Sequence, residues 1–245
     1  MSAPIALALD APDLPTAIAW ARIADGHIST LKIGLEVYLR DGNAGVEAIR
    51  AAAPSCQLFL DLKLHDIPNT VAGACRSIRK LNPEYLTVHA LGGREMVASA
   101  VGTLPETKIT AVTVLTSMDQ SDLTSLQLGS VKELSAGLAK MAVSAGARGL
   151  VCSPHEVRAI RAEVGPLITL ITPGVRLAGG TLGDQRRVAT PSQALNDGAD
   201  LLVIGRPITD AWETGGQSAV AVALGNVLDD LRSYTHKATS FPLPS

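Results

Sequence analysis

The chain has 245 residues, of which 47% are hydrophobic and 18% charged, a composition that suits one larger α/β domain or two small domains. Its formal net charge is -2 and its pI is near 6.2, which argues against the strongly basic surface of a protein that binds nucleic acid or an anionic membrane. Aromatic residues make up only 3% of the chain, too few for a base-stacking surface, so we expect a small-molecule substrate and neither a nucleic-acid nor a membrane partner.

Short apolar runs of strand length alternate along the chain with segments of helical spacing. The predicted strands are 5–10, 30–34, 57–63, 85–90, 108–115, 149–153, 167–175 and 200–206. Segments of helical spacing between them include 14–24, 45–53, 70–81, 131–147 and 155–165. Parallel strands need crossover connections, so this alternation indicates right-handed βαβ units. The eight units predict a single-domain (β/α)8 barrel, the TIM barrel.

An open, doubly wound sheet is the alternative architecture. Such a sheet usually carries a G-x-G-x-x-G turn after its first strand, whereas this chain has DAPDLP at 10–15. The sequence shows no interdomain linker and no low-complexity segment. We therefore expect one barrel domain over residues 1–236 and a frayed tail, rich in Ser and Pro, over residues 237–245.

The cysteines and the hydropathy pattern bear on the compartment. Cys56, Cys75 and Cys152 lie in apolar surroundings without the spacing of a metal site, so we expect buried thiols in a reducing compartment. The first residues lack the basic region of a secretory signal, and no apolar stretch approaches the roughly 18 residues of a membrane span. These features predict a cytoplasmic protein.

The barrel prediction also locates a site, because active sites of this architecture form at the C-terminal ends of the strands. Most of the unusual polar residues of the chain fall at these predicted ends. They are Asp10, Lys32, Asp61, Lys63, His89, Thr116, Ser117, the segment 173–176, Gly205 and Arg206.

Charged residues interrupt the apolar strand within LDLKLHDIPNT (60–70). Residues two apart in a strand share a face, so Asp61 and Lys63 are predicted to point to the barrel axis while the leucines point to the helices. A covered parallel sheet has no solvated face, so these charges require partners. Lys32 on the neighbouring strand and Asp10 complete a set in which lysines and aspartates alternate, a candidate catalytic site.

Two segments near the end of the predicted barrel indicate a phosphate site. ITPGVR (171–176) leads into a Gly-rich segment, and IGRP (204–207) ends the eighth strand; loops after strands seven and eight often bind phosphate in barrels. Gly179, Gly180 and Gly183 would allow the first loop to act as a mobile lid.

Three further polar residues remain open on the evidence of the sequence. For His89 a core histidine is the more frequent case, and we assign it no role. Thr116 and Ser117 could hydrogen-bond a polar ring or could equally cap a helix or stabilise a turn.

The motifs LALD, LKIG, LDLKLHDIPNT, VHALGG, VTVLTSM, TPGVR, DQRR and VIGRP, in this order, resemble the bacterial type of orotidine 5'-phosphate decarboxylase. The resemblance covers about residues 5–210. It implies a homodimeric barrel that converts orotidine 5'-monophosphate to UMP and CO2, the last step of UMP biosynthesis, without a cofactor or a metal.

The resemblance also implies a role for individual residues. Lys63 would protonate C6 of the pyrimidine, with Asp61 beside it and Asp66 reaching the partner subunit's site. Lys32 would belong to the same charged network and, with Asp10, would hold the ribose hydroxyls. The remaining substrate-binding residues that it implies are Thr70 near the ribose of the partner's site, Thr116 and Pro173 at the pyrimidine, and Arg176, Gln185, Gly205 and Arg206 at the phosphate.

Two other functions are compatible with parts of the pattern. Metal-dependent sugar-phosphate enzymes, such as hexulose-phosphate synthase or ketogulonate-phosphate decarboxylase, share D-x-K-x-x-D but carry an acidic metal ligand on strand two. Lys32 stands there in this chain, and its positive charge would oppose Mg²⁺. The other possibility is a non-catalytic UMP-binding barrel, which would have no need of the buried charges at Asp61, Lys63 and Asp66.

Overall fold

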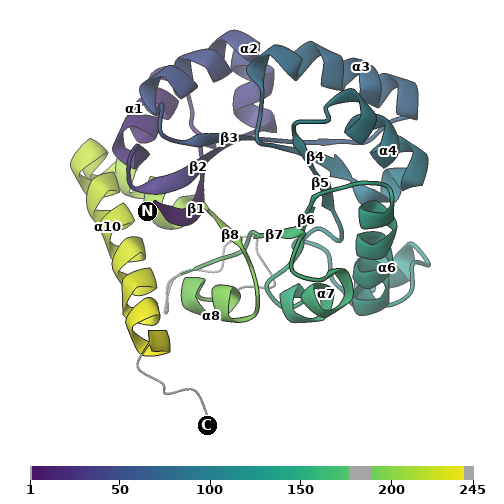
Figure 1. The fold of residues 1–245 in the computed structure, drawn as a ribbon. Helices are drawn as coiled ribbons and strands as arrows, with labels where there is room; N and C mark the ends of the chain where they lie inside the picture. The colour runs from purple at the N-terminus through teal and green to yellow at the C-terminus, as the bar shows by residue number, and fades with distance from the viewer. Residues whose placement is uncertain (1, 177–188, 240–245) are drawn as a thin grey trace.

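The computed structural model describes residues 2–176 and 189–239, with side chains up to Arg232. Eight parallel strands close into a barrel in chain order, and the last strand pairs with the first (Figure 1). The strands are β1 (Ala3–Ala8), β2 (Ile28–Gly34), β3 (Gln57–Leu64), β4 (Tyr85–His89), β5 (Lys108–Val112), β6 (Gly149–Val151), β7 (Thr169–Thr172) and β8 (Leu201–Ile204). The predicted (β/α)8 barrel is therefore confirmed, and closure excludes the open sheet.

Helices connect the strands and form a ring outside the barrel (Figure 1). They are α1 (Leu14–Ala24), α2 (Leu35–Ala52), α3 (Pro68–Ile78), α4 (Gly93–Thr103), α5 (Gln120–Ser125), α6 (Val131–Ser144), α7 (Val157–Val164), α8 (Pro191–Asn196), α9 (Arg206–Thr209) and α10 (Ala211–Thr239). Two short 3₁₀ helices, η1 (Arg79–Leu81) and η2 (Ala90–Gly92), follow α3 and β4.

Local sequence signals set the starts of several helices. Asp13 precedes α1 and its Oδ1 accepts a hydrogen bond of 2.8 Å from the backbone N–H of Thr16, which satisfies a donor left free at the helix start. Ser130 caps α6 in the same way through the N–H of Glu133. Helix α1 has the bounds that its apolar spacing predicts, because both its cap and its apolar face agree with the fold.

The apolar core has two parts, separated by the wall of strands. Outward-facing strand residues pack against the helices in the larger cluster. A smaller cluster fills the barrel interior and consists of Ala6, Phe59, Tyr85, Ile171 and Leu201. Phe59 and Tyr85 meet edge to face with their ring centroids 5.7 Å apart. The barrel interior is thus packed toward the N-terminal ends of the strands, and the space available to a ligand lies toward their C-terminal ends.

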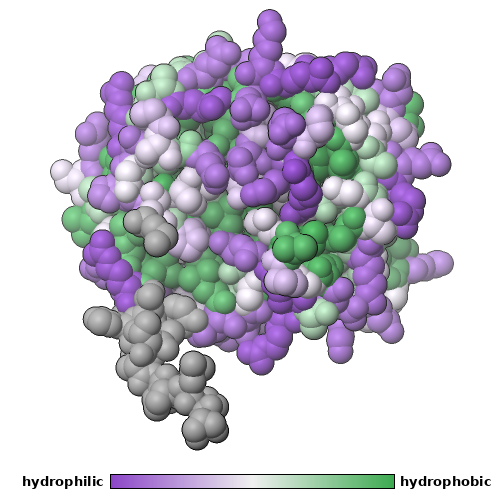
Figure 2. Space-filling view, in the orientation of Figure 1, coloured by the Kyte–Doolittle hydropathy of each residue, from purple (hydrophilic) through white to green (hydrophobic). Residues whose placement is uncertain are grey.

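The polar surface, and the burial of two of the three cysteines, agree with this separation of an apolar core from the solvent. In the view of Figure 2, hydrophilic residues cover most of the face, and hydrophobic residues form separate patches between them. Cys75 and Cys152 are buried as expected, whereas Cys56 is only partly buried. Burial raises the pKa of both Cys56 and Cys75 to about 11, which keeps these thiols protonated at neutral pH.

The C-terminal part of the fold is helical. α10 continues to Thr239, three residues beyond the predicted end of the barrel domain at 236. Residues 240–245 lie outside the described part of the chain, so the predicted tail stays a prediction. Within the described residues, no helix combines the length and the apolar character needed to cross a membrane.

Candidate active site

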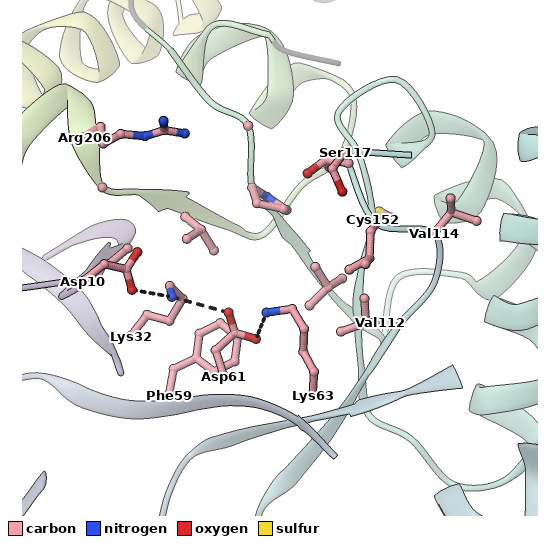
Figure 3. Close-up of a pocket in the computed structure, with 18 of the residues that line it drawn as sticks. Asp10, Lys32, Phe59, Asp61, Lys63, Val112, Val114, Ser117, Cys152 and Arg206 are labelled. Carbon is pink, nitrogen blue, oxygen red and sulfur yellow. Dashed lines mark hydrogen bonds and ion pairs between the residues drawn. The ribbon is translucent and has the colours of Figure 1, made fainter. Parts of the chain in front are cut away.

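A cavity of about 290 Å³ lies at the C-terminal ends of the barrel strands, the edge at which the sequence predicts the site. Nine of the predicted site residues line it together. They are Asp10, Lys32, Asp61, Lys63, Thr116, Pro173, Arg176, Gly205 and Arg206. Phe59, from the packed interior layer, lies at its base (Figure 3).

Four charged side chains of alternating sign form a row along one side of the cavity (Figure 3). Lys32 Nζ lies 3.5 Å from Asp10 Oδ1 and 3.4 Å from Asp61 Oδ2. Lys63 Nζ donates a hydrogen bond of 2.8 Å to Asp61 Oδ1. The row therefore runs Asp10, Lys32, Asp61, Lys63, with both inner charges held by two groups of opposite sign.

Burial differs along this row. The side chain of Lys32 is 8% exposed and that of Asp61 14%, whereas Lys63 is 34% and Asp10 56% exposed. Burial acts to raise the pKa of Asp61, but the positive charges of Lys32 and Lys63, with hydrogen bonds from Lys63 and Thr87, outweigh it. The pKa of Asp61 thus lies below its usual range, and its carboxylate is charged at neutral pH.

Gly34 provides the room that the row needs. It ends β2 two residues after Lys32, on the same face of the strand. A Cβ at this position would lie 3.1 Å from both Asp10 Oδ1 and Lys32 Nζ. A larger residue would therefore displace the ion pair between these two groups.

Arginines from the last two strand ends lie on the same cavity. Arg176 follows β7, and Arg206 begins α9 directly after β8, with its guanidinium pointing toward the cavity in Figure 3. Burial lowers the pKa of Arg176, and the positive charge of Arg206 lowers it further, against a smaller opposing effect of Asp210. Two guanidinium groups that repel each other in one cavity favour an anionic ligand. The predicted residues Gln185, Gly179, Gly180 and Gly183 lie outside the described residues.

Mostly apolar side chains line the cavity between the charged row and the arginines. Val112, Val114, Cys152 and Pro173 belong to this stretch, and the hydroxyl-bearing Thr116 and Ser117 follow β5 at its edge. The apolar lining and the two guanidinium groups thus suit a molecule with a weakly polar body and an anionic end.

Two predicted residues lie outside the cavity. Asp66 and Thr70 are exposed, one in the turn after β3 and the other in the first turn of α3. Oδ1 of Asp66 accepts a hydrogen bond from the backbone N–H of Ile67. Neither residue lines the cavity of its own chain.

His89, which the sequence left without a role, stacks on His65. Their ring centroids are 5.3 Å apart and their planes differ by 16°. His89 Nδ1 accepts a hydrogen bond from the N–H of Leu91. Burial, followed by the charges of His65 and Lys63, lowers the pKa of His89, so this ring is neutral at pH 7.

Thr87 is a polar residue of the site that the sequence alone failed to identify. It lies in the middle of β4 and donates a hydrogen bond of 3.0 Å to Asp61 Oδ1. The only signal in the sequence is a hydroxyl two residues before His89, on the inward face of an apolar strand. That signal is weak, because threonine is common in strands.

The carboxylates of the described residues do not form a metal site. Among the side chains of residues 2–176 and 189–232, no group of three or more His, Cys, Asp or Glu is placed to hold a metal ion. Asp61 in particular faces the two ammonium groups of Lys32 and Lys63.

The family models provide an independent comparison. Residues 3–218 match the model of the orotidine 5'-phosphate decarboxylase / HUMPS family. The matched segment contains every residue predicted for the site.

Curated proteins and solved structures give the same result. A protein named orotidine 5'-phosphate decarboxylase from Thermobifida fusca is 60% identical over 91% of this chain and 96% of its own length. Its namesake from Frankia casuarinae is 50% identical over 91% and 87%. The crystal structure of orotidine 5'-phosphate decarboxylase from Lactobacillus acidophilus superposes with a TM-score of 0.74 at 33% identity, over 93% of this chain and 99% of that one.

Proposed function

The chain belongs to the orotidine 5'-phosphate decarboxylase family, and from this premise we propose that its cavity converts orotidine 5'-monophosphate to UMP and CO2 with Lys63 as the proton donor. The observation that supports this most strongly is the alternating row of charges. Its outermost ammonium, on Lys63, is fixed 2.8 Å from Asp61 and stays partly exposed to the cavity. The reaction is the last step of UMP biosynthesis.

The proposed substrate fits the cavity in one direction. Its phosphate would lie between Arg176 and Arg206, the positively charged end of the site. Its ribose hydroxyls would reach Asp10 and Lys32. The pyrimidine would then lie against the apolar stretch, with Thr116 at its polar edge and C6 close to Lys63.

The chemistry explains why an ammonium is needed at that point. Loss of CO2 from C6 leaves a pair of electrons that the pyrimidine ring cannot delocalise. A positive charge already fixed where negative charge develops stabilises that state without reorganisation. Lys63 then gives a proton to C6 in place of the departing CO2.

Asp61 has a positioning role in this proposal, because its carboxylate holds the ammonium of Lys63 in place at 2.8 Å. Repulsion between Asp61 and the substrate carboxylate is a secondary hypothesis. At about 4 Å and an effective dielectric constant near 20, it would amount to about 4 kcal/mol, or roughly three orders of magnitude in rate if fully relieved. Such destabilisation cannot supply the whole effect.

The metal-dependent branch of the superfamily fits the site less well. Its members need an acidic ligand where this chain has Lys32, whose side chain is 8% exposed and whose ammonium is already paired with two carboxylates. The relatives at 60% and 50% identity are named decarboxylases of orotidine 5'-phosphate. A non-catalytic UMP-binding barrel would not require the buried charges of this row, whose burial is costly.

One assay tests the proposed reaction. Purified protein treated with EDTA is mixed with orotidine 5'-monophosphate, and the loss of ring absorbance is followed. We expect turnover that chelation leaves unchanged. No turnover by the wild type would rule out the proposed function, and activity lost on chelation would favour the metal-dependent alternative.

We further propose that the protein is a homodimer in which Asp66 and Thr70 serve the partner's site. Apolar side chains are exposed after three consecutive strands, β2 to β4. Their exposed fractions are 47% for Leu35, 78% for Leu39, 66% for Ile67 and 43% for Leu91. Strand β3, whose following turn carries Asp66, is the middle one of these neighbouring strands, and a second copy would cover the exposed apolar side chains.

Mixing two inactive variants tests the shared site. Lys63→Ala and Asp66→Asn should each be inactive alone. In a mixed dimer, one site would combine intact Lys63 with intact Asp66, so random exchange should restore about a quarter of wild-type activity. If Asp66 acted in its own subunit's site, mixing would restore nothing. Light scattering on each variant checks that both still dimerise.

Finally, we propose a cytoplasmic location. The described cysteines are free thiols, and Cys75 and Cys152 are buried. Free thiols of this kind are typical of a reducing compartment.

A further inference from the structure

Strand β3 departs from regular pairing where it carries the reactive lysine. Leu60 pairs with Leu86 and Leu64 pairs with Val88, so four steps along β3 match only two along β4. Lys63 lies in this irregular stretch with φ of 45°, a left-handed conformation that is unusual for a residue other than glycine. Such a conformation persists only when its surroundings hold it.

Thr87 is the single β4 residue between the two regular pairs, and its hydroxyl holds the irregular stretch. Thr87 Oγ1 accepts a hydrogen bond of 2.8 Å from the backbone N–H of Lys63. The same hydroxyl donates a hydrogen bond of 3.0 Å to Asp61 Oδ1. A hydroxyl can do both at once, because it has one donor and two acceptor lone pairs.

These two bonds connect the backbone of Lys63 to the carboxylate that receives its ammonium. Asp61 Oδ1 also accepts from Lys63 Nζ at 2.8 Å. Lys63 is therefore held at its backbone and, through Asp61, at the end of its side chain by one buried group. Thr87 itself is fully buried, with an exposed fraction of 0%.

We propose that Thr87 is a positioning residue for the decarboxylation, which fixes Lys63 in its left-handed conformation and aims its ammonium at the reacting carbon through Asp61. This inference rests on the proposed function. It assigns Thr87 no contact with the substrate, so its loss should affect the chemical step more than substrate binding.

Three variants test the inference. Thr87→Val has nearly the same shape but no hydroxyl, and Thr87→Ser keeps the hydroxyl but loses the methyl group. Thr110→Val is the matched control: Thr110 is equally buried in the neighbouring strand β5, but its hydroxyl donates to the carbonyl of Lys108, away from the cavity. For each variant kcat, KM, UMP affinity and thermal unfolding are measured.

We expect Thr87→Val to lower kcat by about ten- to a hundredfold, because a small displacement of a reacting group is enough for such a loss. Its KM and its UMP affinity should stay within about threefold of the wild type, since both report ground-state binding. Thr87→Ser should recover most of kcat, and Thr110→Val should lose none.

Other outcomes would overturn the inference. If Thr87→Val kept full kcat while the wild type turned over, the positioning role would be wrong and the proposed function would stand. If Thr87→Val and Thr110→Val lost kcat and thermal stability alike, or if Thr87→Ser failed to recover, the effect would be one of packing. If the wild type itself showed no turnover, the proposed function would fail, and the inference with it.

Discussion

Replacing Lys63 by Ala should lower kcat by about four orders of magnitude or more, because it removes both the fixed positive charge and the proton donor. Proton transfer by a positioned side chain contributes about 10²–10⁴ in rate, and one electrostatic contact about 10²–10³. The two losses fall on the same step, since the ammonium that stabilises the charge at C6 also neutralises it.

Binding of UMP should change far less in this variant. Asp61 keeps Lys32 at 3.4 Å and the hydroxyl of Thr87 at 3.0 Å, so its carboxylate retains two partners. The arginines at the far side of the cavity are untouched. A loss confined to kcat would therefore separate the role of Lys63 in the chemical step from a role in holding the product.

Lys108→Ala is the control for a general effect of removing a lysine. Lys108 begins β5, at the opposite end of the barrel, where its ammonium is paired with Glu84 at 2.9 Å. We expect kcat to be unchanged in this variant. Turnover by Lys63→Ala at the wild-type rate, measured by ring absorbance, would remove the proton-donor assignment.

The fold was predictable because the apolar patterning of the sequence and its local signals, such as helix caps, indicate the same elements. Short apolar runs mark the strands, and the spacing of 14–24 matches α1 because a cap at Asp13 supports the same start. The ends of the strands were harder to predict, because the strand-like sequence continues beyond the paired residues into the polar residues of the site. The predicted strand 167–175, for example, is observed as β7 only over Thr169–Thr172.

The site was predictable at those residues whose burial alone carries a free-energy cost. Asp61 and Lys63 stood out because a buried charge requires a partner, and strand alternation placed both on the inner face. Both do line the cavity, but the structure reaches this arrangement through an irregular segment in which Lys63 has a φ of 45°. The rule that residues two apart in a strand share a face therefore predicted the correct face for Lys63, but it did not predict the irregular backbone that places the side chain there.

Thr87 could not have been found in the same way. A buried threonine in a strand is ordinary, and its importance comes from a pairing irregularity that only the three-dimensional register reveals. Asp66 shows the opposite limit. Its residue type and motif identify it, yet its carboxylate is exposed and accepts a hydrogen bond from the turn that carries it, and the site that it is proposed to serve belongs to another subunit.

Replacing Arg206 by Ala should weaken UMP binding by about a hundredfold while the barrel stays folded. Hydrogen bonds to charged groups contribute about 1.5–3 kcal/mol each, and the upper end of that range corresponds to about a hundredfold in affinity. Arg206→Lys should recover only part of the loss, since an ammonium keeps the charge but not the two-pronged geometry. Calorimetric titration with UMP measures both variants.

Uridine separates loss of the phosphate contact from damage to the rest of the cavity. It shares the ring and the ribose with UMP but has no phosphate, so Arg206→Ala should bind it as the wild type does. The ratio of UMP affinity to uridine affinity should therefore fall by the same factor as UMP affinity. This factor is the coupling between Arg206 and the phosphate, as in a double-mutant cycle. Arg158→Ala, which removes an arginine that is 82% exposed on the surface, should leave both affinities unchanged. If Arg206→Ala weakened uridine as much as UMP, Arg206 would act on the shape of the cavity; unchanged UMP affinity would mean that the phosphate binds elsewhere.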